Sequence, residues 1–372
     1  MSAIAAEKIN LLGLDRDGLS DLLVQFGEKP FRARQILQWI HQRGVVDFDQ
    51  MTDLSRELRA KLNGLARIAA PRVIHEQLSE DGTIKWLLSV TGGSAVETVF
   101  IPEARRGTLC ISSQVGCMLN CTFCSTATQG FKRNLSPAEI IGQVFHATQA
   151  LAGGKFGDRR ITNVVFMGMG EPLLNLDAVI PSLNLLRDDL AYGLAARRVT
   201  ISTAGVIPGL EQLGQGVEFA LAVSLHAPDD ELRSKLVPLN RKYPIDELLQ
   251  ACKAYVRGGN RRILTFEYTM IKGVNDGRAQ ARGLVRILNG LPCKINLIPF
   301  NPFPGTPFKP SDPDQIDKFQ SITRAAGIVT TVRKTRGEDI DAACGQLVGK
   351  VLSPSERRRT VQEQLARQAL PA

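Results

Sequence analysis

Residues 109–124 read Leu-Cys-Ile-Ser-Ser-Gln-Val-Gly-Cys-Met-Leu-Asn-Cys-Thr-Phe-Cys and carry four of the chain's seven cysteines. The last three, Cys117, Cys121 and Cys124, are spaced C-x3-C-x2-C. Thiolates this close along a chain can turn inward onto one soft metal centre, because a short loop closes at little entropic cost. Three thiolates leave one iron of a four-iron cluster without a protein ligand, so that iron can hold a small molecule.

Two other interpretations fit the same stretch. One is a zinc knuckle with Cys110 or a histidine as the fourth ligand, although zinc ligands usually come as two separated C-x2-C pairs. The other is a structural disulfide, which requires an oxidising compartment that nothing else in the sequence indicates. The remaining cysteines outside any motif, Cys252 and Cys293, are expected to be buried small hydrophobic residues.

Length and composition indicate a globular protein with one large domain and a smaller one. The chain has 372 residues, and its apolar content of 44% supports a sizeable core. No apolar run approaches the roughly 18 residues of a membrane-spanning helix. The first residues carry Glu7 and Lys8 and lack the apolar core of a signal peptide. We therefore expect a cytoplasmic protein whose cysteines are reduced or bind metal.

The charge balance points to a polyanionic partner. The formal net charge is +9 and the sequence pI is about 9.3, which makes nucleic acid the first candidate. The basic residues are scattered in pairs along the chain, so an ordinary solvated basic surface is the alternative. These pairs are Arg105-Arg106, Lys132-Arg133, Arg159-Arg160, Arg197-Arg198, Arg241-Lys242 and Arg261-Arg262.

The first two segments differ in their hydrophobic period. Residues 1–72 carry apolar stripes at helical spacing and are expected to form a helical accessory domain. A compact helical module of this kind often contacts nucleic acid. Lys29, Arg32 and Arg34 can reach phosphates there, or they simply form a solvated helix face. Residues 73–102 read as a β-meander, with a hairpin turn at Asp81-Gly82.

Residues 103–345 alternate between strands and helices, which predicts an α/β fold. Expected helices begin at the capping box Ser136-Pro137-Ala138-Glu139 and cover 177–189, 244–257 and 278–289. Six βα units with short turns favour an open, partial (βα)6 barrel, followed by a C-terminal tail at 346–372. The expected strands are 108–112, 163–167, 199–202, 219–225, 263–271 and 295–299, with an extra strand at 328–332.

Polar and glycine-rich segments follow the expected strands. In such barrels the chemistry gathers at the carboxyl ends of the strands. The cysteine loop follows the first strand, and residues 168–172 (Gly-Met-Gly-Glu-Pro) follow the second. Residues 202–205 follow the third strand, 224–226 end the fourth, and Asn301 comes just after the sixth. We therefore expect these residues to share one site.

The cysteine motif, with Phe123 before its last cysteine, resembles the signature of radical S-adenosylmethionine (SAM) enzymes. Residues 110–117 (Cys-Ile-Ser-Ser-Gln-Val-Gly-Cys) and 124–135 (Cys-Ser-Thr-Ala-Thr-Gln-Gly-Phe-Lys-Arg-Asn-Leu) are similar to the RlmN family of RNA adenine C2 methyltransferases. The resemblance covers residues 97–344, with a weaker match before them. It implies a [4Fe-4S] cluster on the three cysteines, and SAM on the open iron as the source of a 5'-deoxyadenosyl radical.

The resemblance also implies a set of SAM contacts. Glu171 can pair with the SAM ammonium group, and Gly170 lets the backbone approach the ligand. Three further residues that match SAM contacts also have an ordinary interpretation. Ser202 can be a turn residue, His226 a core histidine, and Asn301 part of a stiff proline-rich turn. The implied contacts are Gly170, Glu171, Ser202, Ser224, Leu225, His226 and Asn301.

Cys344 resembles the family's methyl-carrying cysteine, whereas a lone cysteine before glycine is usually inert packing. The implied route uses two SAM molecules per turnover. The first methylates Cys344, and the second supplies the radical that turns the S-methyl group into a methylene radical, which adds to adenine C2. By resemblance, Cys110 resolves the adduct through a disulfide and Glu97 is the general base. Glu103 and Glu267 are the other carboxylates to consider.

The implied substrates are 23S rRNA, in its peptidyl-transferase region, and the adenosine beside the anticodon of some tRNAs. The target base should be flipped or single-stranded. The implied electron donor is a flavodoxin-like system, and a monomer is expected. Three rival hypotheses remain: a Cfr-like enzyme that methylates C8, a non-catalytic zinc protein that binds RNA, and a radical SAM enzyme acting on a small metabolite.

Overall fold

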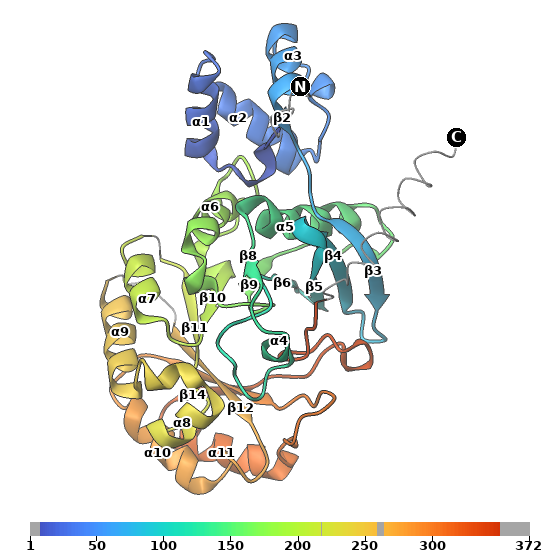
Figure 1. Cartoon of the computed structure of the whole chain (residues 1–372). Coiled ribbons are helices and arrows are strands. Elements are labelled where there is room, and N and C mark those ends of the chain that lie inside the picture. Colours follow the sequence, from blue (N-terminus) through green and yellow to red (C-terminus); the bar gives the residue numbers. More distant parts are fainter. Residues whose placement is uncertain (1–7, 217, 259–263, 350–372) are drawn as a thin grey trace, which may run out of the picture.

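The computed structural model describes residues 8–216, 218–258 and 264–349 of the chain. A sheet of parallel strands forms the middle of the molecule (Figure 1). Each strand pairs with the next along the chain, from β6 to β14. The strands are β6 (Arg106–Cys110), β9 (Asn163–Phe166), β10 (Val199–Thr203), β11 (Ala220–Ser224), β12 (Leu264–Met270), β13 (Lys294–Pro299) and β14 (Val329–Val332).

Helices connect these strands and cover the outer face of the curved sheet (Figure 1). The expected alternation of strand and helix, and with it the partial barrel, is confirmed. The helices are α4 (Ser125–Thr128), α5 (Pro137–Ala152), α6 (Leu176–Arg187), α7 (Ile207–Gly214), α8 (Asp230–Leu236), α9 (Ile245–Arg257), α10 (Arg278–Leu288) and α11 (Pro313–Ala325).

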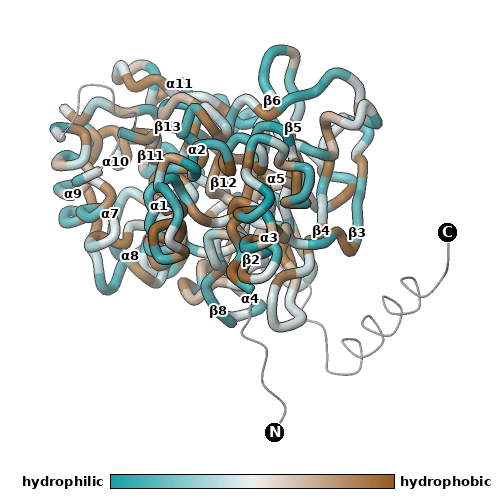
Figure 2. Tube along the Cα trace, turned by 90° about the horizontal axis from the view of Figure 1, so that it is seen from above, coloured by the Kyte–Doolittle hydropathy of each residue, from teal (hydrophilic) through white to brown (hydrophobic). Residues whose placement is uncertain are grey.

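The core lies between the sheet and these helices. Strand side chains such as Val164, Ile201 and Leu221 are fully or almost fully buried, and helix α9 contributes Leu248 and Cys252 from the other side. Figure 2 shows hydrophilic segments mainly at the periphery and hydrophobic segments toward the interior. This distribution is what apolar strands covered on both faces require. The tight packing holds the strand ends at fixed positions.

Helix α5 begins as the sequence predicts. Ser136 Oγ accepts a hydrogen bond from the Glu139 N–H, and Glu139 Oε2 accepts one from the Ser136 N–H. Arg133 forms an ion pair with the same carboxylate at 2.8 Å, and the Thr91 N–H donates to it. The ion pair and the hydrogen bonds hold the pKa of Glu139 below its ordinary value, although burial acts in the opposite direction.

The β-meander extends the sheet at its β6 edge. It consists of β3 (Arg72–Leu78), β4 (Ile84–Val90) and β5 (Ser94–Glu103), which pair antiparallel, and β5 pairs antiparallel with β6. The predicted turn holds Gly82 at φ +82°, and Asp81 Oδ1 accepts a hydrogen bond from the Thr83 N–H. The meander and the barrel therefore share one ten-stranded sheet.

The N-terminal helices form a separate layer above α5 and α6 (Figure 1). Gly13 is required at the junction, because an added Cβ would lie 2.2 Å from the Ala138 nitrogen at the start of α5. Arg16 pairs with Asp188 at 2.5 Å. The elements are β1 (Ile9–Asn10), α1 (Arg16–Gln25), α2 (Arg32–Leu37), a π-helical turn (Gln38–Gln42), α3 (Arg56–Leu65) and β2 (Ala66–Arg67).

Several elements were not anticipated from the sequence. Helices α7 and α8 have only eight and seven residues, too few for a hydrophobic period to stand out. Helix α11 begins at Pro313, where the proline-rich loop before it concealed the start. The two-stranded pairs β1–β2 and β7–β8 are also new, with β7 at Gln114–Val115 and β8 at Arg133–Asn134. Most of the predicted tail, residues 350–372, lies outside the described residues.

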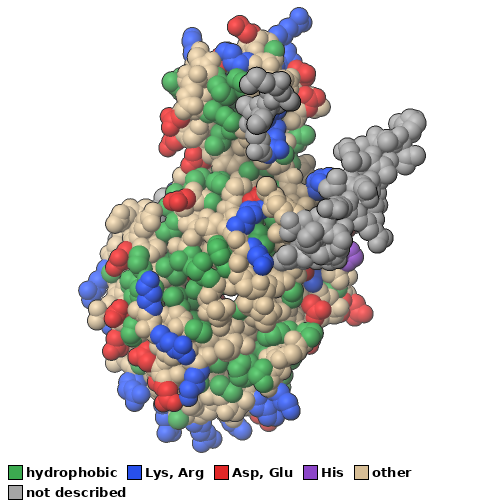
Figure 3. All heavy atoms as spheres, viewed as in Figure 1, with side chains coloured by type: hydrophobic (Ala, Val, Ile, Leu, Met, Phe, Trp, Pro, Cys, Tyr) green, Lys and Arg blue, Asp and Glu red, His purple; other side chains and the backbone are tan. Residues whose placement is uncertain are grey.

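Among the described residues, none of the helices combines the length and the apolar character needed to cross a membrane. On the face shown in Figure 3, Lys and Arg side chains are frequent along the lower edge of the core. Apolar side chains gather nearer its middle, and the N-terminal layer carries both charges. On this face the basic side chains thus lie mainly along the lower edge and on the N-terminal layer.

His41 ties the N-terminal layer to the core and makes stability depend on pH. Its ring is buried, with Nδ1 3.3 Å from Tyr192 Oη, and burial lowers its pKa to about 3. An unfolded chain takes up this proton at about pH 6.5, whereas the folded protein does so only near 3. Lowering the pH through that window therefore favours the unfolded state.

We expect His41→Gln, which cannot take up this proton, to lose less stability on acidification than the wild type. The measurement is the Tm of both proteins between about pH 7 and about pH 5, with the difference read at each pH. His75, which is exposed on β3, provides the control variant His75→Gln. A Tm difference between His41→Gln and wild type that stays constant over this range would contradict the assignment.

Candidate active site

The cysteine loop is bound to the end of the neighbouring strand. The Ile111 N–H donates to the Val165 carbonyl at 3.0 Å, and the Ser113 N–H donates to the Met169 carbonyl at 2.8 Å. Gly116 is needed at φ +74°, because an added Cβ would lie 1.8 Å from the Gly130 carbonyl oxygen. These contacts turn residues 111–124 across the carboxyl end of the sheet.

A buried glutamine fixes the start of the loop. Gln143 on α5 accepts a hydrogen bond from the Ser112 N–H and donates one to the Ser112 carbonyl, both at 2.8 Å. Its Oε1 also accepts a hydrogen bond from Thr98 Oγ1 on β5. Because all these groups are buried, loss of one partner would leave others unsatisfied. The helix, the meander and the loop are therefore held in one arrangement.

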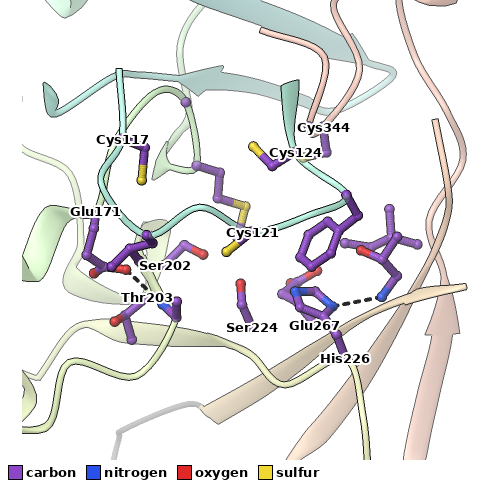
Figure 4. A pocket seen from close by; sticks show the side chains of 18 of the residues that line it. Cys117, Cys121, Cys124, Glu171, Ser202, Thr203, Ser224, His226, Glu267 and Cys344 are labelled. Carbon is purple, nitrogen blue, oxygen red and sulfur yellow. Dashed lines mark hydrogen bonds between the residues drawn. The ribbon is translucent and has the colours of Figure 1, made fainter. Parts of the chain in front are cut away.

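Cys117, Cys121 and Cys124 line a single pocket at this end of the barrel, with their thiols turned toward one another (Figure 4). All seven cysteines are free thiols, so the structural disulfide considered from the sequence is absent. Burial raises the pKa of Cys117 to about 12, and it raises the pKa of Cys121 and Cys124 as well. Thiols in such surroundings become ligands only when a metal displaces their protons.

The three cysteines of the loop suit an iron–sulfur cluster better than a single metal ion. Within residues 8–216, 218–258 and 264–349, no three His, Cys, Asp or Glu side chains converge closely enough to hold one metal ion. A four-iron cluster binds each thiolate through a different iron, so its ligand sulfurs need not converge on one point. Three soft donors in one apolar-lined pocket therefore fit a [4Fe-4S] cluster with one iron left open.

The loop after β9 brings Gly170 and Glu171 to the pocket. The Glu171 carboxylate is buried and accepts hydrogen bonds from the Leu173 and Ala204 N–H groups, at 3.1 and 2.8 Å. Burial raises the pKa of Glu171 to about 7, against the opposing effect of these donors. A cationic group placed beside it would favour the ionised form. The two backbone donors thus hold the Glu171 carboxylate in a fixed position at the pocket.

Ser202 and Ser224 lie at the ends of β10 and β11 and line the same pocket (Figure 4). Arg233, which was not singled out from the sequence, holds these strand ends together. It is fully buried and donates to the Ala204, Ser224 and Leu225 carbonyls. Leu225 itself is fully buried and is not among the residues that line the pocket, so the structure does not bring this expected contact residue to the cavity.

His226 stands in the left-handed region at φ +58°, which is unusual for a residue with a Cβ. Its Nδ1 accepts a hydrogen bond from the Thr269 N–H at 3.0 Å, and its ring meets Phe123 edge-on at 4.5 Å. Burial lowers the pKa of His226 to about 3, so the ring is neutral. Since Nδ1 accepts, Nε2 carries the ring proton and is available as a donor.

Cys344 lines the same pocket as the cysteine loop, although it lies 220 residues beyond Cys124 in the chain. Its carbonyl accepts a hydrogen bond from Asn301 Nδ2 at 3.0 Å, and its sulfur accepts one from Arg333 Nη1 at 3.0 Å. The Ser125 N–H, just after Cys124, donates to the Gly345 carbonyl. The Cys344 segment is thus attached directly to the cysteine loop.

Cys110 is the last residue of β6 and lines an adjoining pocket together with Cys344. Burial raises the pKa of Cys110 to about 12. Glu97 on β5 lines neither of these two pockets. Its carboxylate is buried, accepts a hydrogen bond from the Val348 N–H at 2.8 Å and lies 3.3 Å from Lys85 Nζ. Burial raises the pKa of Glu97, while Lys85 opposes that shift.

The other two carboxylates differ in position. Glu103 is exposed at the far end of β5 and pairs with Arg106 at 2.6 Å, away from both pockets. Glu267 on β12 is buried, lines the main pocket and accepts a hydrogen bond from Asn296 Nδ2. Burial raises the pKa of Glu267. Sequence reasoning did not single out Arg333, although its position directly after the last strand was a usable signal.

Comparison with known proteins identifies the family. Residues 9–68 match the model "Ribosomal RNA large subunit methyltransferase N-terminal domain", and residues 111–282 match "Radical SAM superfamily". The chain is 56% identical, over 363 residues, to the "Dual-specificity RNA methyltransferase RlmN" of Marinobacter nauticus, covering 97% of this chain and 98% of that one. The chain belongs to the RlmN family of radical SAM enzymes.

Other members of the RlmN family are equally close. The protein of that name from Alkalilimnicola ehrlichii is 55% identical over 361 residues, which are 97% of this chain and 99% of that one. A radical SAM methyltransferase from Sphaerobacter thermophilus has a solved structure that superposes with a TM-score of 0.85 and 43% identity. The superposition covers 91% of the present chain and 99% of the Sphaerobacter thermophilus chain. The RlmN N-terminal match coincides with the helical layer above the barrel.

The tight contact at Gly170 yields a prediction. Gly170 has φ +99°, and an added Cβ would lie 2.5 Å from Gln114 Cβ and 2.8 Å from the Gln114 nitrogen. Gly157 has a similar φ of +78° with open space around it, so Gly157→Ala is the matched control. We expect Gly170→Ala to lower the free energy of unfolding by roughly 1–3 kcal/mol more than the control, as overpacking does. Urea unfolding measures both, and equal losses would contradict the contact.

Proposed function

We propose that the chain methylates C2 of adenine in 23S rRNA and in tRNA, carrying the methyl group on Cys344. The observation that carries this proposal is the shared pocket: Cys344 lines it together with Cys117, Cys121 and Cys124. This position beside three candidate cluster ligands favours a chemical role for Cys344 over inert packing. The names of the relatives at 54–56% identity support RNA as the substrate class.

In this proposal each residue of the pocket has a defined task. Cys117, Cys121 and Cys124 hold a [4Fe-4S] cluster, which when bound supplies the electron that cleaves SAM into a radical. Glu171 accepts the SAM ammonium group, and Gly170 admits its backbone contact. The remaining contacts to SAM come from Ser202, Ser224, His226 and Asn301, which all line the pocket.

Cys344 acts first as a nucleophile. Its thiolate forms a bond to the SAM methyl carbon while the bond from that carbon to the sulfonium sulfur breaks. A second SAM, cleaved at the same site, allows one hydrogen to be taken from the S-methyl group. The carbon held on Cys344 then adds to C2 of the adenine, which is too poor a nucleophile to attack SAM directly. Two SAM molecules are consumed per turnover.

Release of the product uses Cys110 and a base. The adduct must then give up one electron, for which the oxidised cluster would be the acceptor, and Glu97 takes the C2 proton. The Cys110 sulfur then attacks the Cys344 sulfur, an S–S bond forms, and the bond from sulfur to the methylene carbon breaks. The carbon keeps the electron pair and takes up a proton to become the product methyl group. An external thiol must reduce the resulting disulfide.

Glu97 needs access to the adduct for this step. In the structure its carboxylate is occupied by the Val348 N–H and by Lys85. We propose that the residues around Val348 shift when RNA binds, which would free the carboxylate. The +9 net charge suits a polyanionic partner, with residues 9–68 as part of its contact surface. A cytoplasmic monomer with a flavodoxin-like electron donor completes the proposal.

The test is an anaerobic reaction of the iron-loaded protein with labelled SAM, a reductant and RNA, followed by mass spectrometry of the nucleosides. We expect 2-methyladenosine from both rRNA and tRNA substrates. Methylation at C8 would replace the proposal by a Cfr-like activity. Colourless protein with bound zinc and no methylated product would replace it by an RNA-binding protein without catalysis.

Two cysteine variants separate the proposed roles. We expect Cys344→Ala to bind the cluster normally and to form no methylated adenosine, because the carrier sulfur is missing. Cys110→Ala should accumulate protein joined covalently to RNA, because the adduct is not resolved. Gel shift under denaturing conditions and iron analysis give both results, with Cys293→Ala as a control outside the pocket. Cluster loss in Cys344→Ala, or normal turnover in Cys110→Ala, would refute the assigned roles.

A further inference from the structure

Arg333 stands between the two pockets that contain the reactive cysteines. It follows the last residue of β14, and its backbone N–H donates to the Leu297 carbonyl on β13 at 2.8 Å. Its side chain lines both the main pocket and the adjoining pocket that contains Cys110. Its Nη1 donates a hydrogen bond to Cys344 Sγ at 3.0 Å. Within the described residues, no other side chain is seen to donate to this sulfur.

We propose that Arg333 is a catalytic residue: its hydrogen bond orients the Cys344 sulfur toward the pocket and stabilises the negative charge that this sulfur carries when it attacks. The inference rests on the proposed role of Cys344 as methyl carrier. A thiolate, not a thiol, attacks a methyl carbon, and a neighbouring guanidinium favours the thiolate form. Hydrogen bonds to a charged group are also shorter and stronger than neutral ones.

The charges around the sulfur show why a cation is needed there. Cys344 shares the main pocket with Arg333, Cys124 and Glu267, and it shares the adjoining pocket with Arg333 and Cys110. Apart from Arg333, these groups are acids that would repel a thiolate when ionised. Cys344, together with Glu267 and Cys110, raises the pKa of Arg333. The guanidinium therefore balances the negative charge that the methyl acceptor must carry.

The contact also changes in the course of the proposed reaction. When it attacks, the sulfur carries negative charge beside the Arg333 guanidinium. In the transfer, the new S–C bond takes up the sulfur electron pair, and the product is a neutral thioether, which is only a weak acceptor. The attraction to Arg333 then falls, while Glu267 stays beside the guanidinium. Arg333 thus binds the Cys344 sulfur more strongly before methylation than after it.

Alkylation by iodoacetamide tests this without SAM or RNA. The Cys344 thiolate displaces iodide from the reagent, so the rate reports how well the thiolate is stabilised and presented. The reaction is run anaerobically on cluster-reconstituted protein with unmodified Cys344, and peptide mass spectrometry follows that residue alone. We expect Arg333→Gln to slow alkylation by about tenfold or more near neutral pH, and Arg333→Lys to fall between it and the wild type.

The matched control is Arg336→Gln. Arg336 lies on the same segment but pairs with Asp81 at 3.7 Å instead of contacting the sulfur. Arg336→Gln should leave the alkylation rate of Cys344 unchanged. A second variant, Glu267→Gln, removes the carboxylate whose charge acts on the Arg333 guanidinium and should accelerate alkylation. If Arg333→Gln fails to retain iron, the alkylation rate of Cys344 in Glu267→Gln tests the proposal instead.

An unchanged rate in Arg333→Gln with its cluster intact would overturn the proposal, as would the absence of acceleration in Glu267→Gln. The outcome is separable from that of the proposed function. If the rates change as expected but no 2-methyladenosine is made, the methylation proposal fails and the role of Arg333 toward the thiolate stands. If methylation occurs and the rates do not change, only the role of Arg333 fails.

Discussion

The attachment of the Cys344 segment to the cysteine loop is the constraint on which the site depends. The Ser125 N–H donates to the Gly345 carbonyl at 2.7 Å, and Thr126 Oγ1 donates to the Leu347 carbonyl at the same distance. These bonds join segments more than 200 residues apart along the chain. Together with Asn301 and Arg333, they fix the Cys344 sulfur relative to the cysteine loop, and in catalysis a barrier difference of a few kcal/mol rests on such positioning.

The parallel sheet supplies the rest of the geometry. Strands that run the same way place their carboxyl ends at one edge, so residues from β9, β10, β11 and β12 meet there although each follows a different helix. Arg233 then donates to backbone carbonyls at the ends of β10 and β11 and so holds these two strand ends together. The pocket is thus built from backbone positions as much as from the side chains that face it.

Much of the architecture could be predicted from the sequence, because the apolar strands and the turn residues carry local signals. The strand order, the capping box at Ser136 and the gathering of Glu171, Ser202 and Ser224 at one edge all follow from such signals. Long-range polar contacts have no local signature. Arg333 donates to the Cys344 sulfur, and the Val348 N–H donates to the Glu97 carboxylate. Both hydrogen bonds depend on how distant segments pack, so the sequence alone does not predict them.

The most direct test of the central claim is a crystal structure of the anaerobically reconstituted protein with SAM. The account predicts one cluster on Cys117, Cys121 and Cys124, with SAM between it and Glu171, and with the sulfur of Cys344 in contact with the same cavity. A structure in which the protein backbone separates Cys344 from the cluster and SAM would contradict it.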